Sequence, residues 1–138
     1  MQRIIKKPSS TCFMEIVPGK YTGSHWSRGS LIVEEHDFIW AEKTLHACVA
    51  NYDHYEFNEL NKKESKNVVD EWRRIVTKMS LEPIEALHDD FFWLERQVFS
   101  LSKELSEEKV KIQKMLEELA DGVEVFLNSR GCFSVLGI

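Results

Sequence analysis

The sequence predicts an α+β fold: a single domain in which a small, mostly antiparallel sheet packs against three to four helices. Short segments with apolar residues at every second position are separated by longer segments with apolar residues at helical spacing, which is typical of this class. The length of 138 residues suits one domain, 1–138. The composition, 43% hydrophobic and 30% charged, is that of a chain that folds around a core.

Two strands are predicted in the first part of the chain. Residues 1–10 are expected to be a loosely held lead-in. Residues 11–17 are apolar and rich in β-prone side chains, and a Pro-Gly pair stops this pattern. A loop that contains glycine and serine follows over residues 20–29, and residues 30–34 form the second predicted strand.

A helix and a third strand are predicted next. Asp37 is expected to be the N-cap of a helix that runs to about Ala50, because its side-chain oxygen can accept hydrogen bonds from the first-turn amides. Residues 54–60 alternate, which predicts a strand. Its aromatic face should point inward and its polar face outward. The inward set is Tyr55, Phe57 and Glu59, and the outward set is His54, Glu56 and Asn58.

The remainder of the chain is predicted to be helical up to a last strand. Residues 61–80 carry an apolar stripe at helical spacing, and residues 84–126 carry a second stripe at heptad-like spacing. One unbroken helix over 83–129 would be about 70 Å long, which is long for a domain with a radius of gyration of about 14 Å. A break within 100–106 is therefore predicted, so that this segment forms a C-terminal helical hairpin. Gly131 should end its second arm, before a strand over 132–137.

The charge distribution favours a basic protein partner. The net charge is −5, and residues 34–60 alone contain seven acidic residues and one lysine. This balance argues against general binding of nucleic acids or anionic membranes, which need an excess of basic residues. No run is long and apolar enough to span a bilayer, and no signal-peptide pattern opens the chain. Three widely spaced cysteines are typical of buried thiols in the reducing cytoplasm.

No catalytic, metal or cofactor motif stands out. The five histidines are scattered, with no spacing typical of zinc ligands. A Gly-x-Ser-x-Gly elbow and a phosphate-binding loop are also missing from the sequence. The loop over 23–29 is read either as a hairpin connection or as a partner-contacting loop, because Trp26 and Arg28 are residue types favoured as interface anchors.

The expected site is therefore a binding face rather than a reaction centre. The acidic residues of the middle block could merge into one negative surface, since elements that are neighbours in sequence usually pack together. The predicted partner-binding residues are Glu34, Glu35, Asp37, Asp53, His54, Glu56, Glu59, Trp26 and Arg28.

The segment from Gly19 to Leu60 resembles the front half of small bacterial immunity proteins of the polymorphic and contact-dependent toxin systems. The resemblance rests on the run His-Trp-Ser-Arg-Gly-Ser-Leu at 25–31 and on Tyr-Asp-His-Tyr at 52–55. It implies a non-enzymatic cytoplasmic protein that neutralises one cognate toxin by tight binding. Such toxins are often basic nucleases, which would suit an acidic face.

Two alternatives stay open. A small hydrolase or ligand-binding domain could use His25, His54 and nearby carboxylates, and it should then show a pocket with converging polar groups. A helical adaptor could dimerise through residues 84–126, and it should then show an exposed apolar seam.

Overall fold

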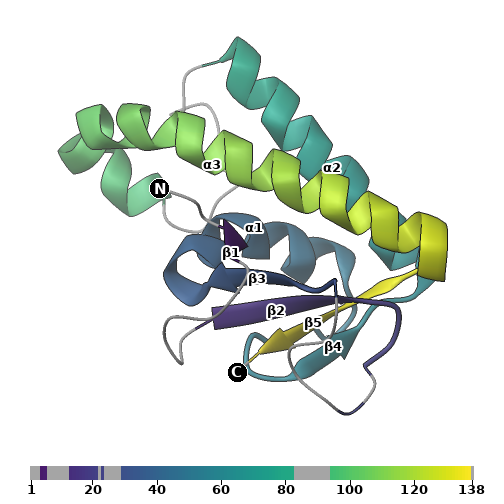
Figure 1. Cartoon of the computed structure of the whole chain (residues 1–138). Coiled ribbons are helices and arrows are strands. Elements are labelled where there is room, and N and C mark those ends of the chain that lie inside the picture. The colour runs from purple at the N-terminus through teal and green to yellow at the C-terminus, as the bar shows by residue number, and fades with distance from the viewer. Residues whose placement is uncertain (1–3, 6–12, 22, 24–28, 83–93, 138) are drawn as a thin grey trace.

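The computed structural model of the chain describes residues 4–5, 13–21, 23, 29–82 and 94–137, with the backbone alone at 4, 5, 36 and 94–108. The elements in chain order are β1 (Ile4–Ile5), β2 (Phe13–Pro18), β3 (Leu31–Glu34), α1 (Glu35–Cys48), β4 (Phe57–Glu59), α2 (Lys62–Leu81), α3 (Leu94–Arg130) and β5 (Phe133–Gly137) (Figure 1).

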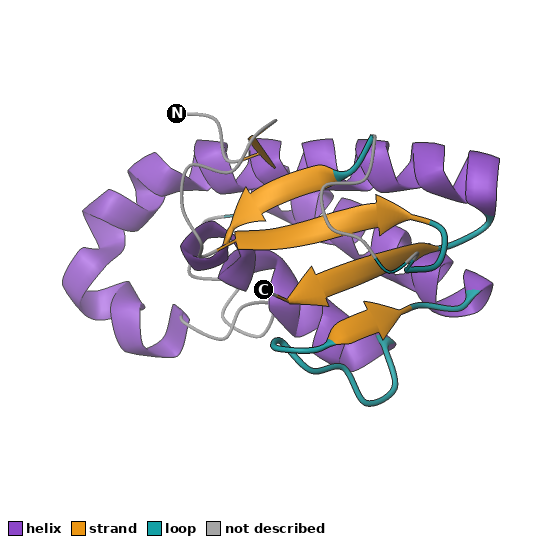
Figure 2. Cartoon of the chain, turned by 60° about the horizontal axis from the view of Figure 1, so that its bottom comes forward, coloured by secondary structure: helices purple, strands orange, loops and turns teal. Residues whose placement is uncertain are grey.

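The strands form one antiparallel sheet, in the order β1-β3-β2-β5-β4. The three helices lie on the same face of it (Figure 2). The prediction of an α+β fold with a small antiparallel sheet is therefore confirmed. One strand was not predicted: Ile4 and Ile5, within the expected lead-in over 1–10, pair with Val33 and Ile32 at the edge of the sheet.

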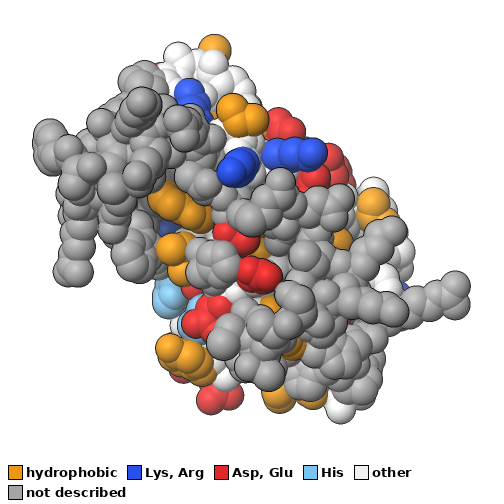
Figure 3. Space-filling model, turned by 60° about the vertical axis from the view of Figure 1, so that its left-hand side comes forward, with side chains coloured by type: hydrophobic (Ala, Val, Ile, Leu, Met, Phe, Trp, Pro, Cys, Tyr) orange, Lys and Arg blue, Asp and Glu red, His pale blue; other side chains and the backbone are white. Residues whose placement is uncertain are grey.

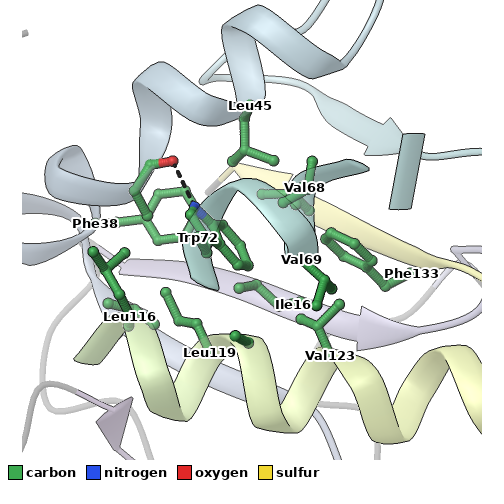
Figure 4. Close-up of a cluster of buried hydrophobic side chains, with 14 of the residues drawn as sticks. Ile16, Phe38, Leu45, Val68, Val69, Trp72, Leu116, Leu119, Val123 and Phe133 are labelled. Carbon is green, nitrogen blue, oxygen red and sulfur yellow. Dashed lines mark hydrogen bonds between the residues drawn. The ribbon is translucent and has the colours of Figure 1, made fainter. Parts of the chain in front are cut away.

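The core lies between the sheet and the helices. Alternation along β2 and β5 turns Met14, Ile16, Phe133 and Val135 toward the helical layer, where all four are buried. Trp72 of α2 occupies the middle of the cluster (Figure 4). Its indole N–H donates a 3.2 Å hydrogen bond to the carbonyl oxygen of Ala41, so its polar atom is satisfied inside the core.

α2 and α3 pack side by side and antiparallel. Gln113 of α3 donates a 2.6 Å hydrogen bond to Ser80, near the end of α2. Further toward the start of α2, Arg73 lies 3.1 Å from Asp121 of α3. The predicted stripe is buried where side chains are described, at Ile112, Met115, Leu119 and Phe126.

The predicted break at 100–106 is wrong, because α3 is one continuous helix of 37 residues. The segment contains neither Gly nor Pro, so nothing in it interrupts the helical hydrogen bonds. The helical pair is instead made by α2 and α3, and Figure 1 shows the first turns of α3 curving away from its straight part. Gly131 does end the helix as predicted, in a left-handed conformation with φ of 80°.

The start of α1 also differs from the prediction. Glu34 is the N-cap, without a capping hydrogen bond from its side chain, and the helix begins at Glu35. Asp37 therefore lies inside the first turn, where it is buried. The predicted N-cap is thus three residues, nearly one turn, too late, although a carboxylate in the first turn still interacts favourably with the helix dipole.

The predicted strand over 54–60 is shorter and faces the other way. Only Phe57–Glu59 is extended, and residues 53–56 form a turn. Asn58 is 8% exposed, whereas Phe57 is 47% exposed. The Asn58 amide is buried because it donates hydrogen bonds to two carbonyl oxygens of the turn that precedes it. These hydrogen bonds outweigh the gain from burying an aromatic ring at a sheet edge.

A capping box starts α2. The Asn61 side chain accepts a 2.7 Å hydrogen bond from the Glu64 amide, and the Glu64 carboxylate accepts one from the Asn61 amide. The other oxygen of that carboxylate accepts the Ala50 amide at 2.9 Å, which ties the end of α1 to the start of α2. The box is therefore both a helix cap and a tether between two helices.

Replacing Asn61 with alanine is expected to lower the free energy of unfolding by about 1 kcal/mol, because an amide of the first turn loses its acceptor. The matched control is Asn67→Ala, the same substitution at an exposed position inside α2, where alanine favours the helix. Urea denaturation measures both variants. Equal stabilities for the two would contradict a capping role for Asn61.

Candidate functional site

The strand register brings several of the predicted acidic residues to one end of the sheet. Glu34, at the end of β3, pairs with Phe13 at the start of β2. Met14 in turn pairs with Gly137 at the end of β5, and the Gly137 amide donates a hydrogen bond to Glu56 in the turn that precedes β4. We call this end of the sheet the acidic end; it comprises Glu34, Glu35, Glu42, Asp53 and Glu56. Figure 3 views the molecule from this side and shows acidic side chains gathered beside histidine.

His54 lies at the centre of the acidic end, between two carboxylates of α1. Its Nδ1 is 2.6 Å from a Glu42 oxygen, and its Nε2 is 3.3 Å from a Glu35 oxygen. The two glutamates are seven residues apart, so they lie on the same face of the helix, two turns from each other. Each ring nitrogen needs a hydrogen to donate to its carboxylate, and only the charged imidazolium carries both.

The same Glu42 oxygen also accepts a 2.9 Å hydrogen bond from the Tyr52 hydroxyl. Glu42 and Tyr52 are both buried, so the carboxylate is compensated by two donors where water does not reach it. Burial, together with the charge of Glu42, raises the pKa of Tyr52 far above its ordinary value, and Tyr52 stays a donor.

The pKa of His54 is the result of opposed effects. Partial burial lowers it, while the hydrogen bonds and charges of Glu42 and then Glu35 raise it, and the net direction is upward. His54 is only 18% exposed, so solvent screens these contacts incompletely. The geometry and the direction of the pKa therefore agree on a charged His54 as the form that fits the site.

Asn58 holds the turn over 53–56. Its amide nitrogen donates to the carbonyl oxygens of Asp53 at 2.7 Å and Glu56 at 3.1 Å, and its oxygen accepts the Asp53 amide at 3.0 Å. The Asp53 side chain closes the turn further, because it accepts the Tyr55 amide at 2.9 Å. The turn is thus built from its own polar groups and does not need a partner to order it.

The end of β5 also packs against the turn over 53–56. The Gly137 amide donates a 3.0 Å hydrogen bond to the Glu56 carbonyl oxygen. A Cβ atom at Gly137 would lie 2.0 Å from the His54 carbonyl oxygen, so only glycine allows the two backbones to approach this closely. The C-terminal strand and the turn therefore form one packed unit.

Two exposed aromatic residues lie in or directly after the turn over 53–56. Tyr55 is 77% exposed, and its ring meets the His54 ring edge-on at 4.8 Å between centroids. Phe57 is the half-exposed neighbour on β4, and its ring lies 4.6 Å from that of Tyr21. A large exposed ring on a rigid turn is typical of an interface anchor, because it can bury much area at little cost in entropy.

The structure brings together Glu34, Glu35, Asp53, His54 and Glu56 among the predicted partner-binding residues. His54 contacts carboxylates of the protein through both ring nitrogens, and its role in partner contact stays a prediction.

Four of the predicted residues do not join this group. Asp37 is buried in α1. Glu59 lies toward the opposite end of β4, where its carboxylate accepts the Tyr21 amide at 2.9 Å. Trp26 and Arg28 lie outside the described residues, as does His25.

Sequence reasoning missed Glu42, Tyr52 and Asn58. The seven-residue spacing of Glu35 and Glu42 on a predicted helix was the one available signal for the first of these. Nothing in the pattern of the sequence indicated that the chain after α1 would return to that helix face. The role of Asn58 was hidden because its position was assigned to a solvated strand face.

A cavity of about 420 Å³ lies between the start of α2 and the end of α3. It is away from His54, because Gly131 precedes β5 whereas His54 contacts the end of that strand. Its lining mixes two lysines with two acids and contains no histidine, cysteine, serine or threonine: Lys62, Lys66, Val69, Asp70, Glu124, Leu127, Asn128 and Gly131. Its candidate nucleophiles and general bases are therefore limited to the two lysines and the two carboxylates.

The described residues contain neither a metal-binding cluster nor a membrane-spanning helix. In those ranges no group of three or more His, Cys, Asp or Glu side chains is arranged to hold a metal ion. No helix in the same part of the chain is long and apolar enough to cross a membrane. Comparison with protein-family models, with curated proteins and with solved structures finds no match to this chain.

Proposed function

We propose that this protein is an immunity-type inhibitor, which binds a basic protein toxin through the acidic end and blocks it. The observation that carries the proposal is the exposed Tyr55 ring on a hydrogen-bonded turn that also contains Asp53 and Glu56. An aromatic anchor with acidic residues in the same turn suits a surface rich in Arg and Lys, whose side chains pair with carboxylates and stack on aromatic faces.

Two physical effects support this mode of binding. The negative field of the acidic end speeds the diffusional encounter with a basic partner and orients it. The ordered turn then limits the entropy lost on docking, so more of the contact energy appears as affinity. The basic toxin is expected to be a nuclease, whose cationic substrate-binding surface would be covered by the inhibitor.

A non-enzymatic role is favoured over the hydrolase alternative at His54. A general base needs a free lone pair within reach of its substrate. Both nitrogens of His54 face carboxylates within the protein, and the ring is mostly buried. The adaptor alternative is weakened as well, because the described part of its stripe, from Ile112 to Phe126, is packed inside the chain.

The described thiols fit a reducing compartment such as the cytoplasm. Cys48 and Cys132 are both free and partly buried. Burial, and then the nearby charge of Glu71, raises the pKa of Cys48, which keeps the thiol protonated and less reactive. A toxin that acts on cytoplasmic nucleic acid would meet its inhibitor there.

The test is the association rate with the toxin encoded in the neighbouring reading frame. Asp53→Asn with Glu56→Lys removes negative charge from the acidic end, and asparagine keeps the acceptor that closes the turn. At low salt this variant should associate about tenfold more slowly than wild type, and the difference should shrink at high salt. Stopped-flow fluorescence measures both rates.

The matched control is Glu117→Gln with Glu118→Lys, which makes the same change in net charge on the exposed side of α3. It should leave the association rate close to that of wild type. Equal slowing by both variants would mean that net charge alone matters, and no slowing by the first would show that the partner docks elsewhere. If wild type does not bind the toxin or protect cells from it, the proposed function is wrong.

A further inference from the structure

We propose that His54 is a proton-operated latch: when charged it holds the turn over 53–56 against α1, and when neutral it lets the turn loosen. The latch regulates the docking surface of the acidic end. Its effect on partner binding rests on the proposed function, whereas the latch itself is a property of the protein alone.

The geometry makes the two states different. The charged ring donates from Nδ1 to Glu42 and faces Glu35 with Nε2, at 2.6 and 3.3 Å. A neutral ring has one N–H, so one nitrogen would direct its lone pair at a carboxylate. That contact is repulsive. Glu35 is partly exposed, so the contact between Glu35 and His54 is the one that can open and admit water.

Among the described residues, the charged groups that act on His54 include no second cation. From α1 the groups that face His54 are Glu35 and Glu42, and from its own segment they are Tyr52, through Glu42, and Tyr55, with Asp53 adjacent in the chain. β5 presents Gly137, which has no side chain to titrate. Among the described residues that act on the ring, every charge is therefore negative, and loss of the His54 proton leaves unbalanced repulsion.

The raised pKa of His54 determines how the stabilising effect of the latch depends on pH. The pKa of His54 in the folded protein is raised above the ordinary value of 6.5 by its carboxylate partners, which outweigh burial. A raised pKa means that the folded state binds the proton more tightly than the unfolded state does. The contribution of the latch is thus fully present below pH 6.5 and is lost as the pH rises through the raised value.

The test follows the His54 ring and the turn separately in the whole protein, without a partner. NMR titration of the ring gives the His54 midpoint. Amide exchange, corrected for the intrinsic effect of pH, reports the turn through the Gly137 amide, which is bonded to Glu56. The Leu60 amide, bonded to Phe133 in the same pair of strands, is the reference.

Protection of the Gly137 amide is expected to fall about fivefold as the pH passes the His54 midpoint, the factor for losing one half-exposed ion pair. Protection of the Leu60 amide should stay constant. Glu35→Gln removes one of the two carboxylates that raise the His54 pKa, so it should move the midpoint of the ring and of the turn to lower pH together. This variant changes a partly exposed residue and leaves Glu42 and Tyr52 in place.

His54→Lys supplies a charge that persists to higher pH and should make the Gly137 protection independent of pH from 6 to 9, since lysine titrates near ~10.4. The latch is overturned if the Gly137 protection does not change across the His54 titration. It is also overturned if Glu35→Gln moves the midpoint of the ring and leaves that of the turn unchanged.

The pH dependence of toxin binding distinguishes failure of the latch from failure of the proposed function. The association rate of wild type with the neighbouring toxin should fall as the pH rises through the His54 midpoint, and that of Glu35→Gln should fall at lower pH. If no toxin binds at any pH while the ring and the turn titrate together, the proposed function fails and the latch stands. If the toxin binds and the turn ignores the ring, the latch fails and the proposed function stands.

Discussion

Replacing Trp72 with alanine is expected to lower the free energy of unfolding by about 3–5 kcal/mol, the cost of truncating a large buried aromatic residue. Trp72 is fully buried, and it contacts the sheet through Phe133, whose ring centroid lies 6.4 Å from its own. The neighbours come from α1, α3 and the sheet and are held by their own elements, so the cavity cannot collapse easily (Figure 4). Urea denaturation measures the loss.

Trp72→Phe separates packing from hydrogen bonding at the same position. It keeps an aromatic ring and removes the N–H that donates to Ala41. It should cost clearly less than alanine, although the carbonyl oxygen of Ala41 loses its indole donor. If alanine and phenylalanine were equally destabilising, the loss would come from the hydrogen bond rather than from the packing of the core.

Replacing Gly137 with alanine is expected to cost about 1–3 kcal/mol, the range for overpacking a site that cannot yield. The new Cβ would lie 2.0 Å from the His54 carbonyl oxygen, and a backbone atom on a hydrogen-bonded turn has little room to move. The turn should shift, which would alter the His54 and Tyr55 signals in NMR spectra and slow the association with the toxin.

Gly122→Ala is the matched control for this substitution. Its Cβ would also meet a close neighbour, but that neighbour is the tip of the Leu31 side chain, at 2.7 Å, which can rotate away. Alanine inside α3 also gains helix propensity of about 1 kcal/mol relative to glycine. The control should be close to neutral, and a Gly137→Ala variant as stable as this control would contradict the tight packing of β5 on the turn.

Local sequence patterns predicted an element correctly where the residues that define it lie within the element itself. The stripe and the cap of α2 are both within residues 61–81, so the predicted helix over 61–80 matches the observed Lys62–Leu81. The strands at β2, β3 and β5 were also found, because alternation is a local property that burial on one face reinforces.

Local sequence patterns gave wrong predictions where contacts with other parts of the chain determined the structure. The break expected within 100–106 came from the need for compactness, but α2 already supplies a partner for α3. Residues 54–60 do alternate in the sequence, but Asn58 rather than the aromatic residues faces inward, because its side chain bonds to Asp53, to Glu56 and, on β5, to Val135.

The sequence by itself determined the α+β class, most of the helices and strands, and the concentration of acidic residues between Glu34 and Glu59. Only the tertiary structure decided which of those acids act together. Glu35, Glu42 and His54 meet because the chain reverses after α1 and is held there by Gly137 and Asn58. Such a meeting depends on the packing of separate elements, and side-chain periodicity reports only the faces of each element taken alone.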